Sequence, residues 1–529
     1  MSEIKKLEHL LALGRISRRE FLARASALGL AAAAPSLMTG ASHAPAPSKG
    51  GTLRIGIGHG STTDTLDPAT YENLYTQTLG GTIHRTLSVI ANTGDLVPEV
   101  AESWEPSPDA KQWTFKLRQG VEFHNGKTLE ADDVVATFNH HRGEDSQSAA
   151  KPIVDPITDV TADGKDTVVF TLQEGNADFP YIASDYHLAV LPARDGEVDA
   201  TSGVGCGPYS LDAFEPGVRS TAKRFANYFD DSIAHVDDAE LLVIVDAVAR
   251  SNALTTGEID AMDRVDLKTA HLLARNEGVE LVETSGNAHY TFCMRTDTAP
   301  FDNNDVRLAL KYGLDRQALL DTILLGHGYL GNDTPIGKGN RYYAEEIEQR
   351  AYDPEKAKFH LKQAGMSSLK VDLSAADAAF PGAVDAAVLY KEHAAQAGIE
   401  INVVREPNDG YWSNVWMQKP WSAVYWGGRQ TEDWMFSMAY ATGAPWNDSF
   451  WTHERFNQLL LEARAELDEP KRRQMYVEMQ QIVRDEGGVV VPLFNNYVMA
   501  LSTRIGHEQL ANNWSLDGFR AVERWWVKA

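Results

Sequence analysis

The fold class follows from one stretch of the chain, residues 113–126, which reads WTFKLRQGVEFHNG. Apolar and polar side chains alternate from Trp113 to Arg118, which predicts a half-buried β-strand. A helix is expected to follow from Leu129 to His140, with Thr128 or Asp132 as its cap. A strand followed closely by a capped helix indicates an α/β arrangement.

Outward from this stretch, strands and helices continue to alternate, without an internal repeat. Further strands are expected at 50–58, 166–172, 238–245 and 489–493, and helices at 248–256, from Asp305, from Asp315 to Gly326 and from Asp468 to Gly487. Irregular alternation of this kind is typical of a large α/β protein with mixed sheets.

Bulk composition narrows the functional classes. The chain has 529 residues, 43% of them hydrophobic, which suggests two to four domains with sizeable cores. Its net charge of −25 disfavours nucleic acid and anionic lipid as partners. The only cysteines, Cys206 and Cys293, are predicted to be free, buried thiols.

The first 41 residues resemble a Tat-type export signal. Twin arginines stand in Ser17-Arg18-Arg19-Glu20-Phe21-Leu22, and a short Ala/Leu-rich run, 23–34, follows them. Cleavage is expected after Ala41, leaving 42–49 as a linker, with no lipid anchor and no membrane span in the mature chain. The protein is therefore expected in the periplasm.

Seven ordered blocks resemble family 5 of the extracellular solute-binding proteins, the dipeptide-, oligopeptide- and nickel-binding group. They are 50–55 with 66–68, 96–105, 113–126 with 131–134, 205–209, 257–260, 300–302 with 306–307, and 352–357. The block Gly205-Cys206-Gly207-Pro208-Tyr209 departs from the family's usual G-T-G-P-Y at its cysteine.

This resemblance implies a fold like that of the type II periplasmic binding proteins (cluster C), with two main lobes and an inserted third domain. Domain I would comprise 50–84, 186–288 and 489–529, domain II 85–185, and domain III 289–488. A ligand would bind between domains I and III, and an ABC transporter permease would receive it from a monomeric carrier.

Enzyme signals are weak. Gly56-Ile57-Gly58-His59-Gly60-Ser61 has Ser61 where a dinucleotide-binding loop needs its third glycine, and His453-Glu454 lacks the second histidine of a zinc protease motif. No enzymatic activity, cofactor or metal is expected. A nickel-chelate or haem carrier of the same fold remains an alternative, and so does a secreted hydrolase.

The candidate binding segment is the aromatic-rich stretch from Tyr411 to Trp451, and the alternative for any single tryptophan in it is a place in the core of a lobe. At its centre, Arg429 stands where peptide-binding relatives carry an aspartate for the ligand's amino group. A guanidinium binds a carboxylate bidentately, so the expected ligand is a carboxylate-bearing short peptide, amino acid derivative or opine-like molecule, with Asp433 or Glu432 available for an ammonium group. The candidate ligand-binding residues are Arg429, Asp433, Trp426, Trp434, Gly428, Trp446, Tyr290, His59 and Tyr411.

Overall fold

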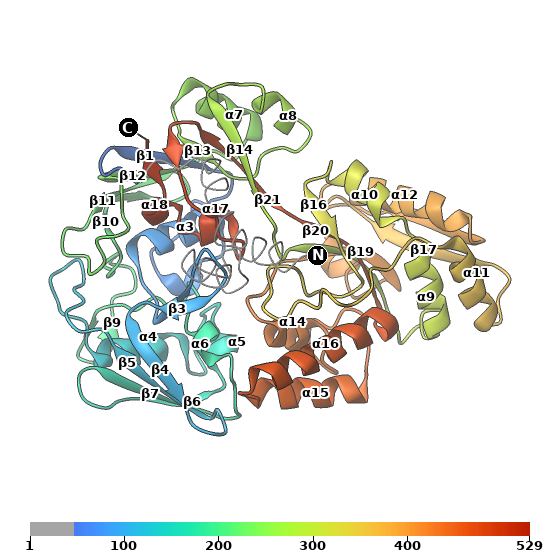
Figure 1. Ribbon diagram of the computed structural model, residues 1–529, viewed down its shortest axis with the longest axis horizontal. Coiled ribbons are helices and arrows are strands. Elements are labelled where there is room, and N and C mark those ends of the chain that lie inside the picture. Colours follow the sequence, from blue (N-terminus) through green and yellow to red (C-terminus); the bar gives the residue numbers. More distant parts are fainter. Residues whose placement is uncertain (1–46, 529) are drawn as a thin grey trace, which may run out of the picture.

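The computed structural model describes residues 47–528. The predicted export signal and most of the predicted linker lie outside them. Two large sheets occupy separate halves of the molecule, which lie side by side in Figure 1. In the part of the chain that the structure describes, no helix combines the length and the hydropathy needed to cross a bilayer.

The first half is built on a mixed seven-stranded sheet. In order across the sheet, its strands are β10 (Tyr209–Glu215), β11 (Arg219–Arg224), β12 (Asp238–Val243), β1 (Thr52–Ile57), β13 (Ala261–Met262), β21 (Tyr497–Ser502) and β14 (Val279–Thr284). The helices of this half are α3 (Leu74–Ile83), α7 (Ala247–Thr256), α8 (Ala270–Leu273), α17 (Ser515–Gly518) and α18 (Ala521–Arg524), with a short 3-10 turn at Pro68–Thr70. Early, middle and late parts of the chain thus share one sheet.

A smaller antiparallel sheet lies in the same half (Figure 1). Its strands are β4 (Ala101–Pro106), β5 (Gln112–Leu117), β7 (Thr167–Leu172) and β6 (Ile157–Ala162), accompanied by α4 (Ala131–His141), α5 (Lys151–Val154) and α6 (Phe179–Ile182). The prediction for the start of α4 was wrong. The helix begins at Ala131, so Glu130 is the cap, and the Asp133 side chain accepts from Glu130 N at 2.9 Å.

Three short strand pairs complete the sheets of this half. They are β2 (Ser88–Ile90) with β3 (Leu96–Pro98), β8 (Ala193–Arg194) with β9 (Glu197–Val198), and β22 (Ile505–Gly506) with β23 (Trp526–Val527).

The second half contains a six-stranded sheet. In order, its strands are β16 (Gly328–Leu330), β20 (Val489–Asn495), β15 (His289–Met294), β19 (Trp421–Trp426), β17 (Leu369–Ala375) and β18 (Ile399–Arg405). Its helices are α9 (Asn304–Tyr312), α10 (Arg316–Ile323), α11 (Pro354–Gln363), α12 (Ala383–Ala395), α13 (Tyr411–Asn414), α14 (Glu432–Ala439), α15 (Glu454–Ala465) and α16 (Glu469–Glu486). As predicted, Asp468 caps α16, accepting from Lys471 N at 2.9 Å.

Two antiparallel segments connect the halves. The chain passes from β14 to β15 through residues 285–288 and returns from β20 to β21 through Asn496. Asn495 N donates to Ala288 O at 3.0 Å, so the two crossings are bonded to each other. A Cβ on Gly286 would lie 2.7 Å from Asn495 O, which explains the glycine at this close approach.

The halves also touch through the segment that contains α6. Ala177 N donates to Arg464 O of α15 at 2.7 Å. Asp178 forms a buried ion pair with Arg472 of α16, at 2.6 Å. Burial opposes the charge on Arg472, but the Asp178 carboxylate outweighs it and raises the pKa of Arg472 above its ordinary value.

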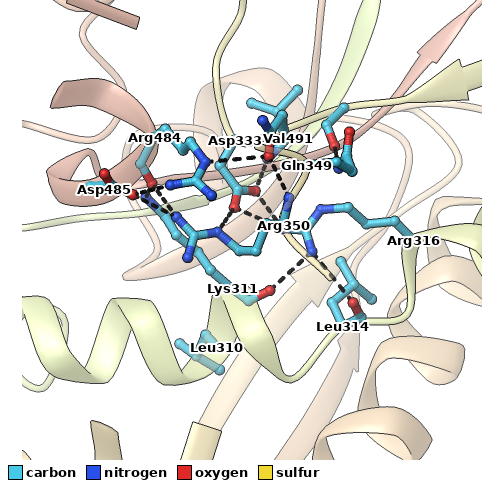
Figure 2. A network of polar contacts seen from close by, with 12 residues as sticks. Leu310, Lys311, Leu314, Arg316, Asp333, Gln349, Arg350, Arg484, Asp485 and Val491 are labelled. Atoms are coloured by element: carbon cyan, nitrogen blue, oxygen red, sulfur yellow. Dashed lines mark hydrogen bonds and ion pairs between the residues drawn. The ribbon is translucent and has the colours of Figure 1, made fainter. Parts of the chain in front are cut away.

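A buried ionic network ties α9, α10, α16 and β20 together, as Figure 2 shows. Asp333 accepts from Arg316 at 2.6 Å, from Arg350 at 2.8 Å and from Val491 N at 3.1 Å. Burial acts to raise the pKa of Asp333, but Arg316 and Arg350 outweigh it and hold that pKa below its ordinary value. Lys311 donates to carbonyls at the C-terminal end of α16, where the helix dipole favours a cation.

The two cysteines are free and buried, as predicted. Cys206 packs in the core beneath the four-stranded sheet, and Cys293 lies in β15, in the core of the second half. They therefore belong to different halves of the molecule.

Candidate ligand-binding site

Three strands of the six-stranded sheet, β17, β18 and β19, have their carboxyl ends on the side nearest the crossings. We call this side the carboxyl edge. β17 runs parallel to both β18 and β19, so these ends meet on one side. β19 is antiparallel to β15, with Trp426 opposite His289, and His289 directly follows the crossing at 285–288. The carboxyl edge therefore lies beside the other half, in the position where open α/β sheets bind ligands.

Arg429 stands at this edge, in the loop after β19, and is partly buried. Within residues 47–528 its hydrogen bonds go to Gly427 O at 3.0 Å, to Gly428 O at 3.2 Å and to Met438 Sδ at 3.5 Å, and none goes to a carboxylate. Burial lowers the pKa of Arg429, and Tyr186, Asp185 and Tyr425 oppose that shift only in part. The guanidinium is thus sheltered from water while its charge has no counterion among the described residues.

The loop around Arg429 is held on several sides. A Cβ on Gly428 would lie 2.5 Å from the Cβ of Asn287, so only glycine allows this approach to the crossing segment. Asn340 Nδ2 donates to Arg429 O at 3.1 Å. Thr431 caps α14 by accepting from Trp434 N at 3.2 Å, and the Trp434 ring lies 5.7 Å from the guanidinium carbon. These contacts fix the backbone from which the guanidinium projects.

The other half brings residues 184–186 to the same place. Ser184 Oγ donates to Gln430 Oε1 at 3.3 Å, across the boundary between the halves. The Asp185 carboxylate is held by His187, whose Nδ1 lies 2.6 Å from Asp185 Oδ1. Tyr186 OH accepts from Gln77 Nε2 at 3.0 Å. Asp185, the carboxylate of this segment whose charge acts on Arg429, is therefore already hydrogen-bonded to His187.

A cavity of about 40 Å³ adjoins this boundary, lined by residues of both halves that include Gln430, Tyr186 and His84. Burial lowers the pKa of His84 to about 3, so its ring is neutral at physiological pH. Both ring nitrogens of His84, Trp514 Nε1 and Asn513 Oδ1 are buried without a hydrogen-bond partner in the described chain. This volume accommodates a few water molecules, which such polar groups require.

Aromatic rings cover the rest of the edge. We call five of them, Trp412, Trp416, Tyr425, Trp426 and Trp446, the aromatic platform. Ring centroids are 5.5 Å apart for Trp412 and Tyr425, 5.9 Å for Trp412 and Trp416, and 6.2 Å for Trp426 and Trp446. Tyr425, Trp446 and Trp412 remain 50%, 46% and 39% exposed, so the platform presents ring surface to solvent.

Asp448 lies beneath the platform and is buried. It accepts from Trp416 Nε1 and from Cys293 Sγ, each at 3.1 Å. Burial raises the pKa of Asp448, against the effect of these two bonds. Among residues 47–528, no group of three or more His, Cys, Asp or Glu side chains is placed to hold a metal ion.

The sequence matches the family described as bacterial extracellular solute-binding proteins, family 5 middle, over residues 95–448. This match covers more than half of the chain. The chain belongs to this family.

Relatives and solved structures agree with this membership. The dipeptide-binding protein of Escherichia coli K12 is 25% identical over 452 residues, which is 77% of this chain and 82% of that protein. The substrate-binding protein CtaP of Listeria monocytogenes has a TM-score of 0.79 at 20% identity, covering 91% of this chain and 100% of that one. The binding protein AgaA of A. tumefaciens R10, solved with agropinic acid, has a TM-score of 0.72 at 23% identity, covering 90% and 99%. The α/β fold of two main lobes, typical of type II periplasmic binding proteins, is thereby confirmed.

In this family 5 protein, several predicted site residues come together at the carboxyl edge. Arg429 lies beside Gly428 and Trp434, and Trp426 packs against Trp446 in the platform. Tyr290 pairs with Tyr425 across β15 and β19, and its ring stacks on Phe380 at 4.0 Å.

Three other predicted residues lie in different surroundings. Asp433 is buried and paired with Arg464 at 3.0 Å, so its charge is already compensated. Tyr411 is buried in the core, where its hydroxyl donates to Ala423 O at 2.8 Å. His59 is exposed in the loop after β1, in the first half, and no described contact joins it to Arg429.

The predicted aromatic-rich segment contains Trp412, Trp416 and Tyr425, but none of them was selected as a site residue. Only the structure shows that Tyr425 faces outward while its neighbours in β19 are buried. Ser184 and Tyr186 reach the site from a distant part of the chain and carry no local signal. Contacts of that kind become visible only when the two halves are placed side by side.

Proposed function

We propose that this family 5 protein is a monomeric periplasmic carrier, exported through the signal in residues 1–41. It captures a small organic ligand between its halves and delivers the ligand to the permease of an ABC transporter. The ligand carries a carboxylate and is a short peptide, an amino acid derivative or an opine-like molecule.

The observation that carries this proposal is the setting of Arg429. Its guanidinium is partly buried at the carboxyl edge and makes no bond to a carboxylate within the described residues. A planar guanidinium presents paired donors that match the two oxygens of a carboxylate, and burial strengthens such a contact. A ligand carboxylate supplies the missing counterion.

Closure of the cleft follows from the same geometry. Arg429 and Gln430 belong to the second half of the molecule, and Ser184 and Tyr186 to the first. A ligand on Arg429 therefore touches both sides only when they are close together. Binding then shifts the population toward the closed form, which the permease recognises. The division proposed from the sequence puts 489–529 in domain I, but β20 (Val489–Asn495) pairs with β15 and β16 in the second half.

The first test is ligand identification followed by substitution of Arg429. Native mass spectrometry of the mature chain, incubated with a bacterial extract, identifies the retained compound, and calorimetry measures its affinity. Arg429→Ala should weaken binding by about 10- to 100-fold, as expected for a lost charged hydrogen bond. The affinity of Arg429→Lys should lie between those of the wild type and Arg429→Ala, because lysine keeps the charge but lacks the planar pair of donors.

Arg473→Ala is the matched control, since Arg473 lies on the surface of the same half and pairs with Glu346. Its affinity should equal that of the wild type. Unchanged binding by Arg429→Ala contradicts the proposed role. A retained nickel chelate or haem favours the alternative carrier, and turnover of an ester and peptide panel favours a hydrolase.

A further inference from the structure

Tyr425 is an exception within its strand. β19 lies between β15 and β17, and each of its other five residues is buried. Tyr425 alone is exposed, to 50%. Its neighbour in space, Trp412, is 39% exposed, and their rings meet at 5.5 Å and 74°. The two rings therefore form a corner with one open face on each.

The corner and the cation lie at the same end of the sheet. Tyr425 is the second-last residue of β19, and Arg429 stands in the loop that follows this strand. Trp412 follows the carboxyl end of β18 through a short loop. A charged anchor and an apolar surface thus lie at one end of the same sheet.

The charges around the corner indicate what it accepts. Aromatic faces attract cations, but the neighbouring guanidinium repels a second cation placed beside it. Asp448 is buried beneath the platform and its oxygens accept from Trp416 and Cys293, so it presents no free oxygen to a cation on the ring surface. A flat, uncharged ring avoids this repulsion and stacks or packs edge-on against both open faces.

We infer that the ligand is a ring-bearing carboxylate, with its carboxylate on Arg429 and a planar ring in the corner between Tyr425 and Trp412. This inference rests on the proposed function and narrows its ligand class. It separates ligands with a planar ring from open-chain acids of similar size.

The experiment compares three probes that differ in one feature each. 3-Phenylpropionate carries ring and carboxylate, 3-phenylpropanamide lacks the charge, and hexanoate lacks the ring. Titration calorimetry on the mature wild-type chain should show 3-phenylpropionate binding about tenfold more tightly than either of the other two, given typical aromatic-pair and charged-contact energies.

Substitutions place the ring on the platform. Tyr425→Leu and Trp412→Leu should each reduce the preference for 3-phenylpropionate over hexanoate at least threefold, whereas Tyr425→Phe should retain it. Phe359→Leu is the control, because Phe359 is 55% exposed on α11, in the same half but away from the edge. It should leave every affinity unchanged.

Three results would show that the ligand is not a ring-bearing carboxylate held in this corner. Equal affinity for 3-phenylpropionate and hexanoate, no binding of 3-phenylpropionate, or full preference in Tyr425→Leu overturns the inference. The proposed function survives these results if binding of hexanoate or of the extracted compound still depends on Arg429. Loss of that dependence overturns the function itself.

Discussion

A pair of buried arginines and the single Arg429, all in the second half of the molecule, have opposite surroundings. Arg316 and Arg350 converge on Asp333 in the interior, where every oxygen of that carboxylate accepts hydrogen bonds (Figure 2). Arg429, at the carboxyl edge, donates only to backbone carbonyls and a thioether among the described residues. The same side chain thus stabilises the fold where its charge is matched, and is available for binding where it is not.

The carboxylates show the same contrast. Asp333 is surrounded by cations, and its pKa is held below the ordinary value. Glu432 is also buried, but it accepts from Tyr342 N without an ion pair in residues 47–528, and burial raises its pKa to about 7. Among the described residues, a cation without a counterion, Arg429, and a buried carboxyl group without an ion pair, Glu432, therefore lie three positions apart in the chain.

Asp333→Ala gives the largest expected effect. Removing this carboxylate leaves Arg316 and Arg350 buried without a counterion, which should lower the free energy of unfolding by about 3–5 kcal/mol. Urea denaturation followed by tryptophan fluorescence measures the loss. Asp372→Ala, at an exposed position on β17, should change it by less than about 0.5 kcal/mol. Equal losses in the two variants contradict the contrast between matched and exposed charges.

Glu432→Gln tests the unmatched carboxylate through pH. The folded protein keeps a proton on Glu432 up to a pKa of about 7, whereas the unfolded chain releases it near 4.5. Glu432 therefore contributes stability that is full below pH 4.5 and is lost as the pH rises through 7, on the order of 3 kcal/mol. Glutamine still accepts from Tyr342 N but does not titrate, so Glu432→Gln should lose less stability between pH 5 and pH 8. If the free energy of unfolding falls equally with pH in the wild type and in Glu432→Gln, this account is contradicted.

Arg429→Met gives the smallest effect and the sharpest contrast. Without ligand, it replaces a partly buried, unmatched cation by an apolar side chain of similar length and should raise stability by about 1 kcal/mol. Arg316→Met should lower stability, because it breaks a matched network. Thermal unfolding of both variants without ligand provides the measurement. If Arg429→Met loses as much stability as Arg316→Met, the distinction between a matched and an unmatched arginine is contradicted.

Local patterns in the sequence predict much of the fold. The alternation at 113–118 and the cap at Asp468 are properties of neighbouring residues, and both were found. The start of α4 was misplaced because Thr128 and Asp132 are favoured cap residues, whereas the helix begins after Glu130, where Glu130 and Asp133 form a reciprocal capping box. Boundaries of this kind depend on where the helix first meets its sheet.

The site was harder to predict, for a physical reason. Arg429 could be selected because a cation between glycines and aromatic residues is conspicuous in the sequence. Asp433 looked equally available, but Arg464 from α15 neutralises it. Tyr411 and Trp412 are adjacent in sequence, yet one is core and the other platform, because successive side chains point in different directions. Partners and directions of this kind are set by tertiary contacts.

The paired crossing at residues 285–288 and 495–496 has a mechanical consequence. A single strand between two bodies permits twisting about its own axis, whereas two hydrogen-bonded strands resist it and leave bending across the pair as the soft coordinate. Gly428 packs directly against Asn287 in this crossing, so the loop that carries Arg429 lies almost on the bending axis. Under the function proposed above, Arg429 would then move little while more distant surfaces separate widely, and its contact with a ligand carboxylate would be the last to be lost as the two bodies part.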